Sequence, residues 1–466
     1  MAAPQIGRIV RRVRQEKGLT QAALATTIGV SASYLNLIEH DQRGVTASVL
    51  IKLAEALGID LAELSGQVER KLEAGLREAL SDPHLSVEEV PAGEIAQIAG
   101  SSPSAARAVL ALYRAYRAAR EDATGIALPS GRRILLPFEE ARDFFNERAN
   151  YFPRLEDRAE ILTAELQALP AEMNHAIAER LRRKHDLNIR VVPLEGALRV
   201  YEPEARQLLL SEQLPRESRG FQLAFQLALL EARSTVEAEI TAANPSSPEA
   251  ASLMRVGLLN YVAGALLMPY HMIREQAAKL RHDIDALAAR FSVSYEQICH
   301  RLTTLQRPND RGVPFFFLRT DLAGNVSKRF AGAGFPFVRF GGSCPRWVAH
   351  TAFATPGEIR VQIAQLPDGA SFLCFARTVS GFAPRWGEPA PIYVVAMGCD
   401  IGHAGQMVYG DGIDPAHAAV GIGLSCRLCD RPNCRSRAFP PIEHRIAVDP
   451  HTTSASPYRF EGKKSE

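Results

Sequence analysis

The most constraining feature of this sequence is a pair of short helical segments joined by a tight turn near its start. Thr20 is a favourable N-cap for a helix over 21–28, and Ser31 is one for a helix over 32–39. Gly29 lies between them and can adopt the left-handed backbone conformation that a tight turn requires. This spacing predicts a helix-turn-helix, a motif whose second helix can enter the major groove of DNA.

A strongly basic segment precedes the helix pair. Residues 1–20 contain five Lys or Arg residues against the single acidic residue Glu16. The chain as a whole has 54 Lys and Arg against 52 Asp and Glu, so any surface for nucleic-acid phosphates must be local. We predict that Arg11, Arg12 and Gln21 contact phosphates. The residues predicted to contact base edges are Ser31, Ser33, Tyr34 and Asn36.

Composition divides the 466 residues into parts of different character. Residues 1–66 form the helix-turn-helix unit, 67–156 a helical connector and 157–310 a mainly helical middle domain. Residues 311–448 are richer in Gly, Pro and aromatic residues and contain short β-like runs. Among them, 315–319 and 326–330 are separated by 323–325 as in a hairpin, and 337–340 is a further expected strand. The middle domain is expected to contain one strand, at 188–192, and 449–466 form a tail. The predicted fold is therefore multidomain α+β, with an all-α N-terminus, a mainly helical middle domain and a β-rich C-terminal domain.

The first unit resembles a known class of DNA-binding module. The run LTQAALATTIGVSASYLNLIEHDQR is similar to the helix-turn-helix of phage-repressor-like regulators of the Cro/CI type. The matching residues are Leu19, Thr20, Gln21, Leu24, Ala25, Gly29, Val30, Ser31, Tyr34, Leu35, Ile38 and Glu39. The resemblance implies binding to double-stranded operator DNA, usually as a homodimer or a higher homo-oligomer. Periodicity alone would equally allow a four-helix module that binds nothing.

The middle domain contains a helix that resembles the metal-binding helix of a peptidase. The runs FQLAFQLALLEA (221–232) and NYVAGALLMP (260–269) are similar to ImmA/IrrE-like metallopeptidases, in which His-Glu-x-x-His binds zinc and activates water. Phe225, Gln226 and Leu229 stand at those positions here. The resemblance therefore implies the fold without the activity, and we expect no enzyme. The alternative is a zinc peptidase that is fused to a DNA-binding module and cleaves a repressor.

Three of the 7 cysteines lie close together near the C-terminus, in the pattern Cys426-x2-Cys429-x4-Cys434. Structural zinc sites need four ligands and often use two C-x2-C pairs, whereas only one pair is present here. Three local cysteines and one distant ligand suit an iron–sulfur cluster of the [4Fe–4S] type better than zinc. The distant ligand is expected to be Cys399, with Cys344 as the next choice and His403 as a weaker one. Three reduced structural cysteines are the alternative to a metal centre.

The order of these features along the chain resembles one family over nearly the whole length. Besides the helix-turn-helix, its markers are RDFFNERANYFP, FQLAFQLALLE, NYVAGALLMP, HRLTTLQRP, GNVSKRF, FGGSCPRW, GCDIGHA, CRLCDRPNCRSRAFPP and SPYRF. They are similar to the short-chain fatty acyl transcriptional regulators, which include regulators of propionate and acetate metabolism. The resemblance implies a C-terminal half that binds a short-chain acyl-CoA and, in some members, an iron–sulfur cluster.

The residues themselves support a ligand site less directly. A site for coenzyme A needs cations for its phosphates and an apolar slot for the acyl chain. Basic residues lie between the aromatic residues of the β-rich domain. The candidates for contacts to the phosphates are Arg319, Lys328, Arg329 and Arg339. Solvated strand faces would show the same composition, so this pattern alone does not define a site.

The beginning of the chain and its apolar runs indicate a cytoplasmic location. The first residues contain no apolar core of a secretory signal. The most apolar stretch, 261–270, is shorter than the roughly 18–20 residues of a membrane span, so no membrane partner is expected. The favoured function is a transcription factor whose DNA affinity is switched by an acyl-CoA, with an iron–sulfur cluster as a candidate for a second switch. A DNA-binding scaffold without a sensor is the remaining alternative.

Overall fold

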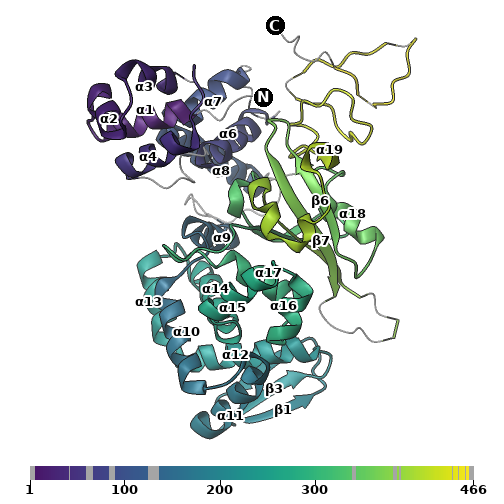
Figure 1. Ribbon diagram of the computed structural model, residues 1–466. Helices are drawn as coiled ribbons and strands as arrows, with labels where there is room; N and C mark the ends of the chain where they lie inside the picture. The colour runs from purple at the N-terminus through teal and green to yellow at the C-terminus, as the bar shows by residue number, and fades with distance from the viewer. Residues whose placement is uncertain are drawn as a thin grey trace.

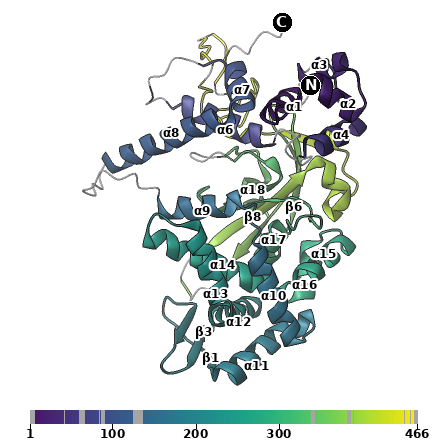
Figure 2. The same ribbon diagram turned by 90° about the vertical axis from the view of Figure 1, so that its left-hand side faces the viewer.

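The computed structural model confirms the multidomain α+β fold. It describes residues 6–40, 42–58, 67–82, 85, 90–123, 136–337, 343–380, 386–387, 390–442, 444–449, 451–456 and 458–460. The helix-turn-helix unit and the C-terminal loops lie at one end of the molecule, and the middle helical domain lies at the other (Figure 1). The larger β-sheet lies between these two ends in both views (Figures 1 and 2).

The described residues of the N-terminal unit form four helices around a core of their own. They are α1 (Ile6–Glu16), α2 (Gln21–Ile28), α3 (Ala32–Glu39) and α4 (Ala47–Leu57). The side chains of Thr20 and Ser31 accept the predicted capping hydrogen bonds at the starts of α2 and α3, and Gly29 has a φ of +72°. Leu24, Leu35 and other apolar side chains fill the centre of this unit. The local prediction of the helix-turn-helix is therefore confirmed.

In the part of the connector that the structure describes, three helices surround a second small core. They are α6 (Gln67–Leu80), α7 (Ala92–Ser101) and α8 (Pro103–Ala123). Leu76 and Ile95 are buried at the centre of this core. The end of the predicted connector, from α9 (Pro137–Glu147) onward, packs into the core of the middle domain.

The middle domain combines helices with a small sheet. Its helices after α9 are α10 (Pro153–Leu166), α11 (Met173–His185), α12 (Arg216–Glu231), α13 (Arg233–Ala243), α14 (Pro248–Leu267), α15 (Tyr270–Lys279), α16 (Ile284–Phe291) and α17 (Tyr295–Thr303). The predicted strand is present as β1 (Asn188–Val192). Two further strands, β2 (Arg199–Glu202) and β3 (Gln207–Ser211), complete a sheet of order β1-β3-β2. Sequence reasoning missed them because each is short and one is only half-buried.

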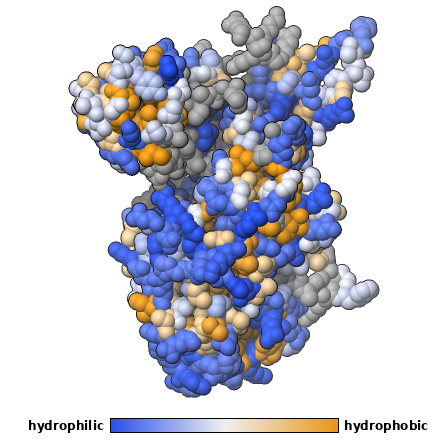
Figure 3. All heavy atoms as spheres, viewed as in Figure 1, coloured by the Kyte–Doolittle hydropathy of each residue, from blue (hydrophilic) through white to orange (hydrophobic). Residues whose placement is uncertain are grey.

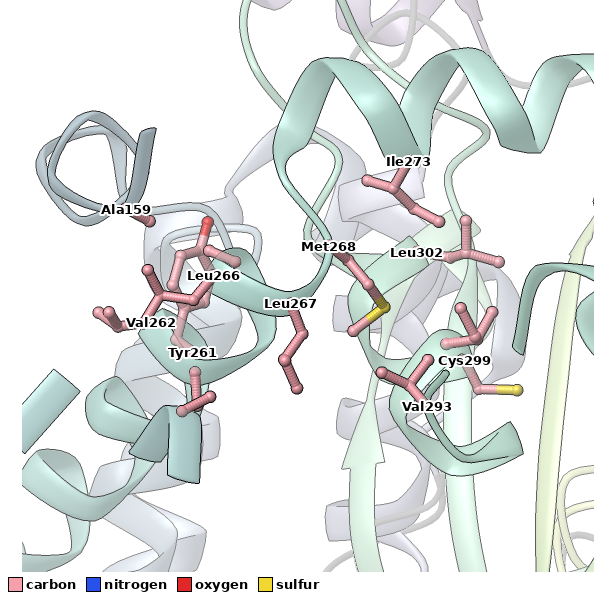
Figure 4. Packing of buried hydrophobic residues seen from close by; sticks show 14 of the residues in the cluster. Ala159, Tyr261, Val262, Leu266, Leu267, Met268, Ile273, Val293, Cys299 and Leu302 are labelled. Atoms are coloured by element: carbon pink, nitrogen blue, oxygen red, sulfur yellow. The ribbon is translucent and has the colours of Figure 1, made fainter. Parts of the chain in front are cut away.

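Helix α14 is the central helix of this domain. By length and composition it could cross a membrane, but more than half of its apolar window is buried inside the protein. Tyr261, Val262 and Leu266 of this helix pack toward Ala159 of α10, and Met268 just after the helix lies near α17 (Figure 4). The surface around the helical body is largely hydrophilic in the view of Figure 3. The apolar character of α14 is therefore explained by its place in the core.

The C-terminal part is built on a six-stranded sheet of order β5-β4-β8-β7-β6-β9. The strands are β4 (Phe316–Asp321), β5 (Val326–Phe330), β6 (Arg360–Gln365), β7 (Ser371–Ser380), β8 (Ile392–Asp400) and β9 (Ala419–Gly421). The predicted hairpin between β4 and β5 is antiparallel, and its turn residue Gly324 has a φ of +84°. Two short helices, α18 (Val348–Thr351) and α19 (Pro415–Ala418), accompany the sheet. The predicted strand over 337–340 lies mostly outside the described residues.

The two faces of this sheet belong to different cores. Phe315 and Phe317 share one core with the helices of the middle domain, whereas Phe316 and Leu318 belong to a second core with Trp347. Because both faces are covered, the run of Phe residues shows no alternation between apolar and polar positions. The β-rich part is thus packed onto the middle domain across one face of the sheet, and a large cavity lies between them.

Candidate functional sites

Helix α3 presents polar side chains to solvent. Ser33 and Asn36 are exposed, whereas Tyr34 is half-buried beneath the guanidinium of Arg43 at 5.7 Å from the ring centroid. The Ser31 hydroxyl accepts a hydrogen bond from the backbone N–H of Tyr34 at 3.1 Å. Ser31 is therefore a helix cap in this structure, and Ser33 and Asn36 are the best-placed side chains for base contacts.

The predicted phosphate contact Gln21 also holds two helices together. Its Nε2 donates to Asn36 Oδ1 at 3.1 Å and to Glu39 Oε2 at 2.7 Å, which joins α2 to α3. Glu39 is buried and forms a two-pronged ion pair with Arg14 of α1, at 2.5 and 2.9 Å. Burial would raise the pKa of Glu39, but the hydrogen bonds from Arg14 and Gln21 outweigh it and hold this pKa below its usual value. Arg14 therefore stabilises the module and is not available to DNA.

The two arginines predicted to contact phosphates lie in different surroundings. Arg11 is exposed. Arg12 is half-buried, and its guanidinium lies 2.9 Å from Glu69 Oε1 on α6. This ion pair joins the helix-turn-helix unit to the connector. Of the two arginines on α1 that we predict to contact phosphates, Arg11 is therefore the exposed one.

The connector in turn contacts the C-terminal sheet. The ammonium group of Lys71 on α6 donates to the carbonyl oxygen of Ala331 at 2.6 Å. Ala331 directly follows β5, and its backbone N–H donates to Asn146 Oδ1 on α9 at 3.4 Å. A series of contacts therefore links α1, through α6, to the end of β5 and to α9.

A large cavity lies between the middle domain and the sheet. Its volume is about 1390 Å³, and its walls come from α9, α12, α14 and α17 on one side and from β4, β5, β7 and β8 on the other. Aromatic and aliphatic side chains line much of it, among them Phe145, Leu214, Phe221, Phe317 and Phe330. The cavity exceeds the roughly 300–1,000 Å³ of pockets for drug-sized ligands, so it has room for a longer molecule.

Three of the four predicted ligand cations line this cavity. They are Arg319, Lys328 and Arg329, and Arg339 lies outside the described residues. Arg319 and Lys328 are opposite each other on β4 and β5. Both contact the carboxylate of Glu296 on α17, at 3.1 Å from Arg319 and 2.8 Å from Lys328. Glu296 could not be identified from the sequence, because its position in the chain does not show which strands its side chain will contact.

One side of the cavity rests on a buried ion pair. Arg301 of α17 forms two hydrogen bonds to Glu156 of α10, at 2.5 and 2.9 Å, and the hydroxyl of Tyr261 donates to the same carboxylate at 2.6 Å. Burial would lower the pKa of Arg301, but the neighbouring Glu156 outweighs it and this pKa is raised. Three marker runs, RDFFNERANYFP, NYVAGALLMP and HRLTTLQRP, thus meet around the cavity and this network.

The position of the degenerate peptidase motif is occupied by a cation from the protein itself. The guanidinium of Arg199 on β2 lies 4.3 Å from the ring centroid of Phe225 and donates to Gln226 Oε1 at 2.6 Å. Phe225 and Gln226 are buried, and Leu229 packs against the same core. A fixed positive charge beside these three side chains disfavours a metal cation there.

Four cysteines line a second, small cavity in the C-terminal lobe. They are Cys344, Cys426, Cys429 and Cys434. Cys399, our first choice for the fourth ligand, lies elsewhere: it is fully buried in β8 opposite Leu373 and belongs to the core shared with the middle domain. The structure therefore brings together the three predicted local cysteines and Cys344, the second choice.

Arg437 organises the cysteine loop. It is buried and donates to the carbonyl oxygens of Cys426, Cys429 and Arg431, each at 2.8 Å. Burial raises the pKa of the Cys429 thiol, although a backbone hydrogen bond from Arg431 and the charge of Arg437 act in the opposite direction. The loop is thus held by backbone contacts to a single guanidinium.

The donor set of this lobe consists of thiols, the ligand type that both zinc and iron–sulfur clusters use. Within the described part of the chain, no three His, Cys, Asp or Glu side chains are arranged closely enough to hold one metal ion. Four thiols that surround a common space match the ligand type of an iron–sulfur cluster. A Cβ atom at Gly423 would lie 2.7 Å from Cys429 Sγ, so this position must be glycine for the chain to pass so close to the thiol. The space is about 10 Å³, room for roughly one water molecule, so a cluster requires the thiols to move outward.

Three successive parts of the chain match known protein families. Residues 10–64 match a family described as helix-turn-helix, and 188–303 match the IrrE N-terminal-like domain. Residues 304–458 match the C-terminal domain described as short-chain fatty acyl coenzyme A regulator. The helix-turn-helix and its attached cavity-bearing domains define a DNA-binding transcriptional regulator.

Full-length relatives support the same assignment. The chain is 40% identical to the HTH-type transcriptional regulator RamB of Mycobacterium tuberculosis, with 98% of this chain and 99% of that protein covered. It is 39% identical to the propionyl-CoA carboxylase regulator of Cereibacter sphaeroides, with 97% and 98% covered. A solved structure of a Mycobacterium tuberculosis transcriptional regulator is 41% identical, has a TM-score of 0.66 and covers 70% of this chain and 99% of its own. The chain belongs to the family of short-chain fatty acyl coenzyme A regulators.

Proposed function

We propose that this regulator changes its affinity for operator DNA when a short-chain acyl-CoA binds in the large cavity. The cavity itself carries the proposal, because it combines an apolar lining with basic residues on one wall. The phosphates of coenzyme A need cations, and Arg319, Lys328 and Arg329 provide them on β4 and β5. The acyl chain needs apolar surroundings, which Phe145, Phe221 and their neighbours provide.

We further propose that the protein acts in the cytoplasm as a homodimer.

The contacts between the cavity and the DNA-binding unit offer a route for the signal. Phe330 lines the cavity, and Ala331 next to it contacts both Asn146 and Lys71. On the same helix as Lys71, Glu69 holds Arg12 of α1. A ligand that moves β5 would therefore act on the helix that holds the DNA-binding unit. A ligand can shift such an equilibrium only by as much as its affinity differs between the two states.

We propose that the protein is not a peptidase. A zinc peptidase needs metal ligands and a base for water, and the residues at the motif positions are Phe225, Gln226 and Leu229. Arg199 adds a positive charge in the same place. Chelator-sensitive proteolysis by the purified protein would contradict this part of the proposal.

Removal of both cations opposite each other in the cavity is expected to weaken binding of an acyl-CoA. The double substitution Arg319→Gln and Lys328→Gln should raise the Kd for propionyl-CoA by roughly 10- to 100-fold, because two charge-assisted contacts are lost. Isothermal titration calorimetry measures the Kd, and an electrophoretic mobility shift with the protein's own upstream region measures the effect on DNA binding. Arg360→Gln, an exposed change on β6 away from the cavity, is the control. An unchanged Kd in the double variant would exclude these cations as ligand contacts.

We also propose that the cysteine lobe holds an iron–sulfur cluster with Cys344, Cys426, Cys429 and Cys434 as ligands. The support is the common cavity of the four thiols and the close approach allowed by Gly423. Such a cluster, when bound, would supply sensitivity to oxidants. The arginine that holds the loop, Arg437, would bring positive charge near the cluster's negative charge.

Substitution of the proposed ligands is expected to remove iron. Cys429→Ser and Cys344→Ser should each lose most of the iron and sulfide found in anaerobically purified wild-type protein, because a cluster that loses a thiolate ligand is held weakly. Cys399→Ser is the matched control, since this thiol lies in the core and outside the cavity. Iron content that falls with Cys399→Ser but not with Cys344→Ser would reverse the assignment of the fourth ligand. Stoichiometric zinc in the wild type would contradict the cluster.

A further inference from the structure

The carboxylate of Glu296 lies between the two cations that face each other across β4 and β5. Glu296 is in the first turn of α17 and lines the large cavity. Its Oε1 atom lies 3.1 Å from a terminal nitrogen of Arg319 and 2.8 Å from the ammonium nitrogen of Lys328. The side chains of Glu296 and Arg319 are 22% exposed, so neither ion is fully hydrated. One carboxylate thus neutralises part of the positive charge of this wall.

The repulsion between the two cations explains why a carboxylate lies between them. Arg319 and Lys328 are direct cross-strand partners, and like charges in that position repel each other. Arg319 has further partners in the Ser327 hydroxyl, at 2.9 Å, and the Tyr393 ring, whose centroid lies 4.5 Å from the guanidinium. For Lys328, the carboxylate of Glu296 is the contact that the structure shows. Glu296 therefore holds α17 against the hairpin.

We propose that Glu296 is an internal anion that competes with an anionic ligand for Arg319 and Lys328 and so sets the ligand affinity of the cavity. This inference rests on the proposed function, because it takes the ligand to be an acyl-CoA with phosphates. A phosphate that binds these two cations must displace the carboxylate or tolerate a negative charge about 3 Å away. A ligand without phosphates does not compete with Glu296. The residue therefore makes the cavity selective for ligands with enough negative charge to replace it, and its release frees the start of α17 from the hairpin.

The substitution Glu296→Gln tests this inference, because it keeps the shape of the side chain and removes its charge. The Kd for propionyl-CoA should fall by roughly tenfold relative to wild type, as one repulsive charge near the phosphates is removed. The Kd for propionyl-pantetheine, a probe without phosphates, should stay within twofold. Glu275→Gln on α15 is the control for a change of net charge, since that carboxylate is exposed and pairs with Lys279. Titration calorimetry at constant ionic strength gives each Kd.

The outcomes separate this inference from the proposed function. Absence of propionyl-CoA binding by the wild type would contradict the proposed function. Binding by the wild type with no tighter binding by Glu296→Gln, or an equal gain for propionyl-pantetheine, would show that Glu296 has only a structural role. The gain in affinity for propionyl-CoA should also be smaller when Glu296→Gln is introduced together with Lys328→Gln. The carboxylate and the ligand then compete for one cation fewer. Glu296→Ser removes the same charge with a smaller side chain and provides the measurement if the glutamine variant is unstable.

Discussion

Replacement of Glu156 by alanine is expected to lower the free energy of unfolding by about 3–5 kcal/mol, because it leaves the Arg301 guanidinium buried without a counter-charge. Both side chains are at most 2% exposed, so water cannot compensate. Arg301 would keep hydrogen bonds to the Met268 carbonyl and the Thr304 hydroxyl, but neither carries a charge. Chemical denaturation followed by circular dichroism would measure the loss.

Two comparisons make this expectation specific. The exposed pair of Glu275 and Lys279 has side chains that are 60% and 62% exposed, and its removal should cost at most about 1 kcal/mol. The double substitution Glu156→Met and Arg301→Met should recover part of the loss, because it removes both charges and retains apolar volume. A loss for Glu156→Ala as small as that for the surface pair would show that the buried ion pair contributes little.

The double substitution Ser33→Ala and Asn36→Ala should weaken specific binding to operator DNA by roughly 2–6 kcal/mol, since one good base contact contributes about 1–3 kcal/mol. Both side chains are exposed on α3, and neither is in the core of the module. The unfolding transition should therefore remain close to that of the wild type. A mobility-shift titration against a specific and a scrambled duplex measures the change in specificity.

The controls address folding and general charge effects. Ser252→Ala changes an exposed hydroxyl on α14 and should leave the operator affinity unchanged. Arg11→Ala should weaken binding to both duplexes and reduce the salt dependence, because a phosphate contact carries no sequence information. Unaltered discrimination between the duplexes in the Ser33 and Asn36 double variant would place base recognition elsewhere.

The cysteine lobe shows which parts of a site can be predicted from the sequence alone. The spacing of Cys426, Cys429 and Cys434 predicted a shared site, and the structure places the three thiols around one cavity. The fourth cysteine could not be chosen from spacing, because Cys344 and Cys399 are both distant in sequence from that loop. Strand pairing determines which of the two lies near the loop: Cys399 belongs to the core shared with the middle domain, whereas Cys344 lines the cavity of the lobe.

The sequence by itself determined the features that depend on a few neighbouring residues. The caps at Thr20 and Ser31, the left-handed turn at Gly29 and the hairpin between β4 and β5 follow from local hydrogen bonding and backbone sterics. The absence of metal ligands in the peptidase motif was also visible in the residues at 225, 226 and 229.

Tertiary structure alone decided which charges are internal and which face a ligand. Arg12 and Arg14 lie near Arg11 in a strongly basic helix, yet they pair with Glu69 and Glu39, which lie 57 and 25 residues away in the chain. Glu156 and Arg301 are separated by 145 residues, and Lys71 and Ala331 by 260. The free energy of an ion depends on its burial and on the charge next to it, and both are set only when distant segments pack together.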